Sequence, residues 1–295
     1  MKKYFVYGLN IESEIDLPGF NQTNEPANIK VQFGLVSDHI ENFKAKGACY
    51  EAKPNEFLLK VLNVGKFFIS NANNICIERA EGADNDSIRL FLLGSAFGAL
   101  FHQLQLLPLH ASVVCVNGEA ILFSGISGAG KSTLAAAFAS KGFETISDDI
   151  ALISIQNNIP VVVPGPAHLK LWSDSLKSLG MNSKKGDKVR KELEKYFVPT
   201  EATSDKSIPL KKVYILNVRN NSDIETIPIK GMEKFTVLRN HTYRINFVKG
   251  LGVENNHFGI TSKLAGLIEI NKLYRNIKGF ETDKLITLIL NDLAL

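Results

Sequence analysis

One octet constrains this chain more than any other part of its sequence. It reads Gly125-Ile126-Ser127-Gly128-Ala129-Gly130-Lys131-Ser132, the pattern G-x-x-x-x-G-K-S. Apolar residues 120–123 precede it and residues 133–139 follow it, which predicts a strand leading into a helix. Glycines let the backbone curl until successive N–H groups point at one phosphate, and the start of the helix adds positive charge. The sequence therefore predicts an α/β fold whose glycine-rich loop, residues 125–132, binds a nucleoside triphosphate.

The residue types in this loop indicate separate roles. Lys131 is predicted to reach the β- and γ-phosphate oxygens as a point charge, and the Ser132 hydroxyl is predicted to ligate Mg²⁺. The other expected nucleotide-binding positions are Gly125, Ser127, Gly128, Ala129, Gly130 and Thr133. A glycine-rich turn without a ligand is the alternative, and the flanking strand and helix patterns disfavour it.

Composition and charge limit the other function classes. The 295 residues include 34 basic and 30 acidic side chains, and 45% of the chain is hydrophobic. This composition suffices for a sizeable core, and the net charge of +4 is too slight to indicate a nucleic-acid partner. The most apolar segment, residues 91–101, is too short to span a bilayer, so no membrane partner is expected.

Cysteine usage and the N-terminus bear on the cellular compartment. Cys49, Cys76 and Cys115 occur singly, and an odd number without a C-x-x-C pair fits a reducing environment. Each lies in an apolar or strand-like stretch, so each thiol is expected to be buried. Residues 1–8 begin like a signal peptide but lack its long apolar region and cleavage site. The sequence therefore predicts a cytoplasmic protein.

The chain divides into two parts by its patterning. Residues 1–86 show short apolar runs separated by Asn, Gly and Pro, which predicts a small β-rich N-terminal region. Residues 87–295 are predicted to form the domain that carries the glycine-rich loop, with a buried helix over about 87–105 between the two parts. The other expected elements are strands at 29–33, 57–61, 66–69, 213–218 and 224–229, hairpins around Asn117-Gly118 and Asn157-Asn158, and an amphipathic helix over 282–293.

A pair of aspartates follows the loop along the chain. Asp148 and Asp149 come directly after a predicted strand at 143–147. A phosphoryl-transfer site uses one carboxylate to hold Mg²⁺ and another to orient or deprotonate the nucleophile. Neighbouring residues of an extended strand point to opposite faces, so a turn is needed to bring both carboxylates to one site. A helix cap or a plain turn is the alternative, and it would be favoured if the loop were absent.

Two histidines are further candidates. His110 lies just before the hairpin strand that leads to the loop, so its ring is expected near the phosphates if the sheet aligns the two strand ends. His168 is a weaker candidate, because lone histidines are more often structural. In the same stretch Lys170 is a candidate for positive charge near the transferred group, and Trp172 is expected to pack.

The sequence around these residues resembles the kinase domain of HPr kinase/phosphorylase and its relatives. The specific matches are Leu109-His110-Ala111-Ser112, residues 125–134, and Ile146-Ser147-Asp148-Asp149. Looser similarity extends through Pro164-Gly165-Pro166, residues 169–172, and His241-Thr242-Tyr243-Arg244. The opening Tyr7-Gly8-Leu9, with residues 13–18, is similar to the start of the kinases found with lasso-peptide biosynthesis.

This resemblance implies a P-loop kinase domain of the HPr kinase/PEP carboxykinase-like type and ATP-dependent phosphorylation of a serine hydroxyl. It implies that Lys131 and Ser132 hold nucleotide and metal, that Asp148 is the general base, that Asp149 lies beside the metal, and that His110 lies near the phosphates. Where the family has an E-I-R-G-L-G segment, this chain has residues 168–171, His-Leu-Lys-Leu. The resemblance therefore does not extend to the phosphorylase reaction or to HPr as the acceptor.

The sequence as a whole predicts a serine kinase that uses ATP and Mg²⁺ and acts on a serine-containing peptide of a natural-product pathway. A small hydroxylated metabolite such as free serine is an alternative acceptor, and a homo-oligomer is left open. The charged residues 183–207 are predicted to be a mobile surface segment, with 184–195 as a candidate clamp for a peptide. A GTPase-like switch is disfavoured, since N-K-x-D is absent and a D-x-x-G at 16–19 precedes the loop. A nucleotide-binding regulator without catalysis is the third alternative.

Overall fold

The N-terminal part of the chain forms one mixed sheet. In this computed structural model the described residues are 1–166, 168–172, 195–199, 206–220, 223–277 and 279–293. The strands of this first sheet are β1 (Lys2–Val6), β2 (Leu9–Ser13), β3 (Asn21–Gln22), β4 (Ile29–Phe33), β5 (Ala45–Lys46), β6 (Tyr50–Lys53), β7 (Glu56–Val61), β8 (Gly65–Ser70) and β9 (Asn74–Arg79). They pair in the order β3-β1-β2-β4-β9-β8-β7-β6-β5, with β2, β4 and β9 parallel to one another. The strands expected at 29–33, 57–61 and 66–69 are confirmed.

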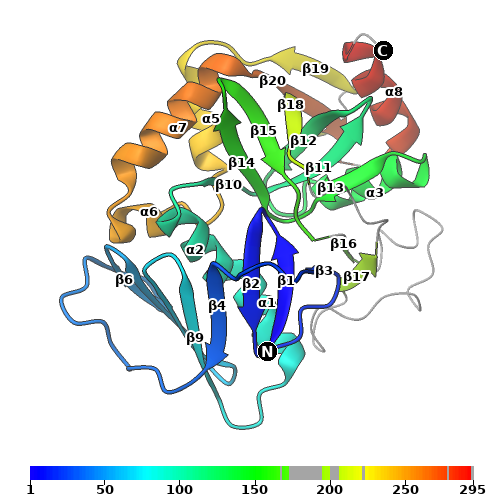
Figure 1. Cartoon of the computed structure of the whole chain (residues 1–295). Coiled ribbons are helices and arrows are strands. Elements are labelled where there is room, and N and C mark those ends of the chain that lie inside the picture. Colours follow the sequence, from blue (N-terminus) through cyan, green and yellow to red (C-terminus); the bar gives the residue numbers. More distant parts are fainter. Residues whose placement is uncertain (167, 173–194, 200–205, 221–222, 278, 294–295) are drawn as a thin grey trace.

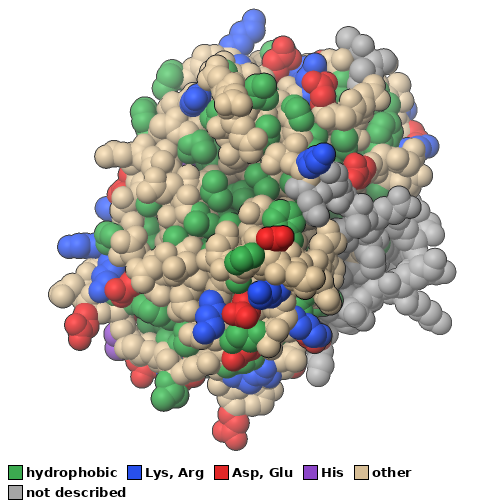
Figure 2. Space-filling view, in the orientation of Figure 1, with side chains coloured by type: hydrophobic (Ala, Val, Ile, Leu, Met, Phe, Trp, Pro, Cys, Tyr) green, Lys and Arg blue, Asp and Glu red, His purple; other side chains and the backbone are tan. Residues whose placement is uncertain are grey.

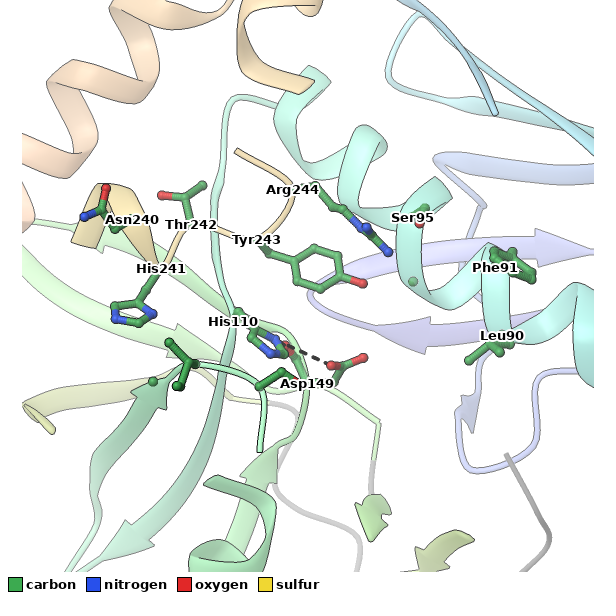
Figure 3. A pocket seen from close by; sticks show the side chains of 14 residues that line it. Leu90, Phe91, Ser95, His110, Asp149, Asn240, His241, Thr242, Tyr243 and Arg244 are labelled. Carbon is green, nitrogen blue, oxygen red and sulfur yellow. Dashed lines mark hydrogen bonds and ion pairs between the residues drawn. The ribbon is translucent and has the colours of Figure 1, made fainter. Parts of the chain in front are cut away.

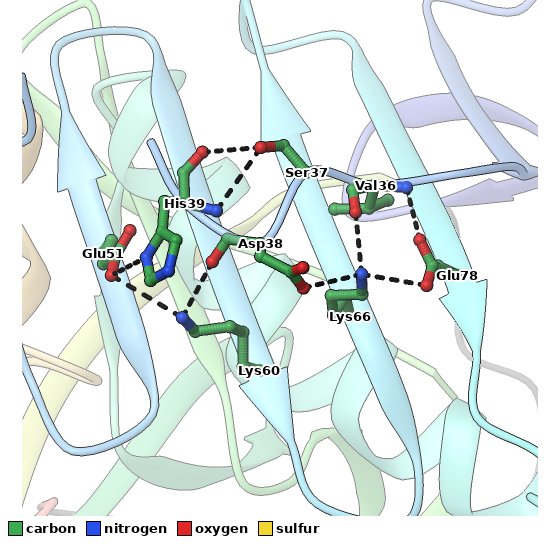
Figure 4. A network of polar contacts seen from close by, with 8 residues as sticks. All are labelled: Val36, Ser37, Asp38, His39, Glu51, Lys60, Lys66 and Glu78. Atoms are coloured by element: carbon green, nitrogen blue, oxygen red, sulfur yellow. Dashed lines mark hydrogen bonds and ion pairs between the residues drawn. The ribbon is translucent and has the colours of Figure 1, made fainter. Parts of the chain in front are cut away.

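A polar network attaches residues 34–44 to the sheet (Figure 4). The Glu51 carboxylate on β6 is fully buried and accepts hydrogen bonds from the Ile40 N–H at 2.9 Å and from His39 Nδ1 at 3.1 Å. The ammonium groups of Lys46 and Lys60 lie 3.4 and 3.6 Å from the same carboxylate. The hydrogen bond from Ile40 is the largest contribution that lowers the pKa of Glu51 to about 2. The charged, buried carboxylate of Glu51 therefore stabilises residues 34–44 against the sheet.

A helical stretch packs between the first sheet and the rest of the chain. It consists of α1 (Asn85–Phe91), a π-helical turn η1 (Leu92–Ala96) and α2 (Phe97–Gln103). The Asp84 carboxylate caps α1 by accepting a hydrogen bond from the Ser87 N–H at 2.8 Å. The apolar side chains of this helical stretch belong to the core of the first sheet, to which residues 243, 247 and 251 also contribute. The buried helix expected at 87–105 is confirmed, with a π-helical turn that its sequence pattern did not indicate.

A second sheet lies above this helical stretch in Figure 1. Its strands are β10 (Leu107–Leu109), β11 (Ala111–Val116), β12 (Glu119–Gly125), β13 (Glu144–Ser147), β14 (Ala151–Gln156), β15 (Ile159–Val163), β18 (Ile208–Arg219), β19 (Glu225–Pro228) and β20 (Glu269–Asn276). The order is β10-β14-β15-β18-β12-β11-β13, and β20 pairs with both β18 and β19. Strands β12, β18 and β20 are parallel to one another. A separate small ladder joins β16 (His168–Trp172) to β17 (Lys195–Pro199).

Helices cover both faces of the second sheet. Helices α3 (Lys131–Ser140) and α8 (Thr282–Asp292) pack on one face in a shared apolar cluster. Helices α5 (Met232–Asn240) and α7 (Glu254–Leu267) pack on the other face. The short α6 (Asn246–Leu251) contacts the first sheet through Phe247 and Leu251. The fold is thus mixed α/β with two large sheets, and the expected domain boundary between 86 and 87 stays a prediction.

Most local expectations for the second sheet are confirmed. The hairpins form around Asn117-Gly118 and Asn157-Asn158, and both asparagines of the second turn have positive φ, +48° and +66°. The strands expected at 213–218 and 224–229 correspond to β18 and β19, and the helix expected at 282–293 to α8. The expectation of three buried thiols was wrong for Cys49, which is exposed, while Cys76 and Cys115 are half-buried. Of the charged segment 183–207, residues 183–194 and 200–205 lie outside the described residues.

The surface reflects the nearly balanced composition. On the face shown in Figure 2, acidic and basic side chains are interspersed over the first sheet. Lys2 on β1 forms an ion pair with Asp16, with their charged atoms 2.7 Å apart. Within the described residues, each helix is too short or too polar to cross a membrane.

We predict that Glu51→Gln lowers the free energy of unfolding by about 1–3 kcal/mol at neutral pH, because an amide cannot satisfy the same donors. The folded-state pKa of Glu51 lies below its unfolded value, so its contribution is present above about pH 4.5 and is lost as the pH falls towards 2. Denaturant unfolding at several pH values measures both effects. Glu41→Gln, on an exposed side chain of the same segment, is the control and should behave as wild type.

Candidate functional site

The glycine-rich loop joins the end of β12 to the start of α3, as its flanking patterns predicted. Gly128 and Gly130 have φ values of +81° and +103°, in the left-handed region that side-chain-bearing residues avoid. The Ala129 N–H donates to the Ile126 carbonyl at 3.1 Å, which closes a tight turn inside the loop. The loop is therefore curled back on itself at the carboxyl end of a buried strand.

The Lys131 side chain, at the end of this loop, hydrogen-bonds back to the start of the loop. Its side chain is only 7% exposed, and its ammonium donates to the carbonyls of Gly125 at 3.0 Å and Ile126 at 3.3 Å. A buried cation is costly unless polar groups surround it, and these carbonyls supply that environment. The first residue of α3 is thereby tied to the last residue of β12, and the positive charge lies within the curl.

Ser132 lies against Asp148. The Ser132 hydroxyl donates to Asp148 Oδ1 at 2.9 Å, and the hydroxyl of Ser112 on β11 donates to the same oxygen at 2.6 Å. Asp148 is 6% exposed at the end of β13. Mg²⁺ in nucleotide sites is held by one or two carboxylates together with phosphate oxygens and waters. One hydroxyl and one carboxylate in contact fit that requirement.

Asp149 lies beside His110, because the chain bends after β13. Its φ is +72°, the chain bends at residues 148–149, and both aspartates reach the region of the loop, as the sequence argument required. His110 Nδ1 lies 3.0 Å from the Asp149 carbonyl and 3.5 Å from its Oδ1. A carbonyl can only accept, so Nδ1 carries the proton and Nε2 is left as an acceptor in the neutral ring.

The glycine-rich loop, His110 and Asp149 open onto a cavity of about 560 Å³ (Figure 3). One wall is formed by Gly125, Ile126 and Ser127 of the loop, with His110 and Asp149 beside them. The opposite walls come from α1 and η1 and from the end of α5 with the segment that follows it; they consist of Leu90, Phe91, Gly94, Ser95, Asn240, His241, Thr242, Tyr243 and Arg244. Figure 3 shows Tyr243 and Arg244 directed towards the helical stretch that carries Ser95.

Backbone pairing brings the 240–244 segment to this place. The His110 N–H donates to the His241 carbonyl, and the Tyr243 N–H donates to the Pro108 carbonyl, both at 2.8 Å. The Tyr243 carbonyl accepts a further hydrogen bond from His102 Nε2 at 2.8 Å. Arg244 has a φ of +54°, and its exposed guanidinium lies 5.4 Å from the centre of the Tyr243 ring.

Burial and charge keep the cavity histidines neutral near pH 7. Burial is the main cause that lowers the pKa of His241 to about 4, and the charge of Lys131 lowers it further. The same two causes lower the pKa of His110, while Asp149 acts in the opposite direction. The cavity histidines are therefore neutral imidazoles that feel the positive charge of Lys131.

The structure brings together the principal residues that the sequence singled out: Lys131, Ser132, Asp148, Asp149 and His110. Pro164-Gly165-Pro166 also lies close, since the Gly165 N–H donates to the Ile146 carbonyl at 3.1 Å. The side chains of His168, Lys170 and Trp172 are not among the described ones, so their expected roles stay predictions.

Several residues of the site received no role from the sequence, among them Ser112, His241, Tyr243 and Arg244. Ser112 and the 241–244 segment stood in stretches that carried the family resemblance, which was the one available signal. The placement of the 241–244 segment depends on pairing with residues 108–110, about 130 residues away in the sequence, which no local pattern encodes.

Comparisons with known proteins add little to this geometry. No protein-family model matches the chain, and no curated protein matches it. Among solved structures, the chain is similar to the HPr(Ser) kinase/phosphatase from Coxiella burnetii, with 14% sequence identity and a TM-score of 0.33. The match covers 63% of this chain and 95% of that chain. A similarity at this level assigns neither a fold nor an activity to the chain.

We predict that Lys131→Met raises the pKa of His241, because it removes a nearby positive charge while burial remains. The value should stay below the ordinary range near 6.5. NMR titration of the imidazole resonances measures this without any assay of activity. An unchanged pKa of His241 would mean that the Lys131 ammonium does not occupy the position given by its hydrogen bonds to the loop.

Proposed function

We propose that this chain is an ATP-dependent, Mg²⁺-requiring serine kinase of the HPr-kinase-like type. The observation that carries the proposal is a closed glycine-rich loop that ends in a serine–aspartate pair and that lines one cavity together with a second aspartate held by histidine. Phosphoryl transfer needs a phosphate cradle, a metal carboxylate and a group that orients the nucleophile. Each part has a candidate here, on residues that also carry the sequence resemblance.

In this proposal the loop amides and Lys131 hold the triphosphate, and Lys131 offsets negative charge on the transferred group. Ser132 would hold Mg²⁺, which neutralises phosphate charge when bound. The cytoplasmic location, the two-domain division at residue 86 and the absence of nucleic-acid and membrane partners remain proposals, as does a homo-oligomer.

The side-chain contacts favour one division of labour between the aspartates. The resemblance implies that Asp148 is the base and Asp149 the metal residue, whereas it is Asp148 that touches Ser132. Asp149 lines the cavity beside His110, where an acceptor hydroxyl has room to approach. We therefore assign Asp148 to the metal and Asp149 to the acceptor proton, with His110 as the residue that positions Asp149.

The acceptor would occupy the part of the cavity away from the loop. Leu90, Phe91 and Tyr243 give that end apolar surface, and Arg244 gives it one positive charge. A volume of about 560 Å³ lies within the range of roughly 300–1,000 Å³ typical of small-ligand sites. Such a cavity suits a short peptide segment or a small hydroxylated molecule better than the surface of a folded protein.

A serine-containing precursor peptide, of the lasso-peptide tailoring type, is the acceptor that we propose first, because the opening of the chain also carries that resemblance. Free serine or another small hydroxylated metabolite is the alternative. The discriminating experiment supplies Mg-ATP with a panel of serine peptides and with free serine, and detects phosphorylated products by mass spectrometry. Nucleotide binding without turnover across the whole panel would favour a non-catalytic regulator instead.

We predict that Lys131→Ala lowers the transfer rate by at least about 100-fold while the protein stays folded, because charge on the transferred group loses its fixed partner. Steady-state kinetics and circular dichroism check the two parts of this statement. Lys141→Ala is the matched control: it lies just beyond the other end of α3, and its ammonium pairs with exposed Asp283 at 2.9 Å. A wild-type rate in Lys131→Ala would remove the assignment of the loop.

We predict opposite signatures for the two aspartate variants. Asp148→Asn should raise the Mg²⁺ concentration needed for half-maximal nucleotide binding, and Ser132→Ala should do the same. Asp149→Asn should bind Mg-ATP normally but lower the transfer rate by roughly 10²–10⁴-fold, the scale for loss of a general base. Metal titrations and single-turnover rates separate the variants. The reverse pattern would restore the division that the resemblance implies.

A further inference from the structure

Arg275, on strand β20, approaches the glycine-rich loop from the side of β18 that is opposite β12. In the parallel strands β12, β18 and β20, Gly125 is level with Leu216, and Leu216 is level with Leu273. Arg275 lies two residues further along β20, so it extends beyond the strand edge from which the loop emerges. Its Nε donates to the Ala129 carbonyl at 2.9 Å, across a sequence separation of 146 residues.

The segment that leads from β20 to α8 places an aromatic ring on the same part of the loop. A side-chain carbon at Gly130 would lie 2.3 Å from the Phe280 ring, so the ring is packed directly on that glycine. The Arg275 guanidinium lies 4.7 Å from the centre of the Phe280 ring. Phe280 packs against the apolar cluster that includes Ala129 and residues 285, 286 and 289 of α8.

Lys131 and Arg275 therefore hold different parts of one loop. Lys131 binds the carbonyls of Gly125 and Ile126 at its start, and Arg275 binds the carbonyl of Ala129 near its end. The Ala129 carbonyl points at the Arg275 guanidinium. The amide of the next residue, Gly130, belongs to the same peptide plane and points the opposite way.

We propose that Arg275 and Phe280 form a brace that holds the glycine-rich loop in its nucleotide-binding conformation, with Arg275 as a positioning residue that acts through the Ala129 carbonyl. This inference rests on the proposed function in one respect, that the loop binds a nucleoside triphosphate. The brace fixes the peptide between Ala129 and Gly130, so the Gly130 amide is already oriented when the anion arrives. Its contribution belongs to nucleotide affinity and not to acceptor recognition.

The experiment uses the full chain and four variants: Arg275→Gln, Arg275→Lys, Phe280→Leu and Arg219→Gln. Arg219 is the matched control, since it lies on neighbouring β18, covers the Tyr274 ring at 3.2 Å and pairs with Glu225 at 3.1 Å, without touching the loop. Calorimetry measures the affinity for a non-hydrolysable ATP analogue with Mg²⁺. Hydrogen exchange without nucleotide measures the protection of peptides that cover residues 126–131.

Arg275→Gln is expected to weaken nucleotide affinity about tenfold or more, the scale of one charged hydrogen bond, and to speed exchange in the loop. Arg275→Lys should recover part of both effects, and the KM for the acceptor should stay within about twofold. Phe280→Leu should shift affinity and exchange in the same direction by a smaller factor, and it supplies the test if Arg275→Gln fails to fold. Arg219→Gln should match wild type.

Wild-type affinity and exchange in Arg275→Gln would overturn the brace. Weaker affinity with unchanged exchange would overturn the positioning role, since Arg275 would then act on the nucleotide itself. Failure of the wild-type chain to bind Mg-ATP would overturn the proposed function, and the exchange measurement would still decide whether the brace exists.

Discussion

The site depends first on the ammonium of Lys131. This cation belongs to the first turn of α3, yet its hydrogen bonds go to the two carbonyls with which β12 ends and the loop begins. Because the side chain is nearly buried, those bonds cannot be exchanged for water without cost. The loop is therefore held as a closed curl around a positive charge. The same charge helps to keep His110 and His241 neutral, so the electrostatics of the cavity follow from this contact.

The strand directions explain why the remaining groups gather around that curl. Strand β11 is antiparallel to both β12 and β13, so the carboxyl ends of β12 and β13 lie at the edge where β11 begins. His110 precedes β11, Asp148 follows β13 and the loop follows β12, so all three meet there. Strands β18 and β20 are parallel to β12, and they bring Arg275 to the same edge. One sheet edge thus collects residues from segments that are far apart in sequence.

The sequence predicted those features that depend on neighbouring residues along the chain. Asn-Gly and Asn-Asn turns adopt positive φ readily, and both hairpins form where these residues stand. The loop and the aspartate pair were also found, since their spacing reflects a local strand–turn arrangement. The π-helical turn at 92–96, the 240–244 wall and the contact from Arg275 were not predicted. Each depends on tertiary packing: the Tyr243 ring, for example, packs closely on Gly98, where an added side-chain carbon would lie 3.0 Å away.

That packing also ties the first sheet to the proposed chemistry. Helix α2 carries both Gly98, against which Tyr243 lies, and His102, which donates to the Tyr243 carbonyl. The buried side chains of α2 share a core with the first sheet, and Tyr243 belongs to that core. A shift of α2 would therefore move the wall that carries Tyr243 and Arg244 and change the far end of the cavity. The β-rich part of the chain therefore shares its core with the residues that hold this wall of the proposed acceptor site.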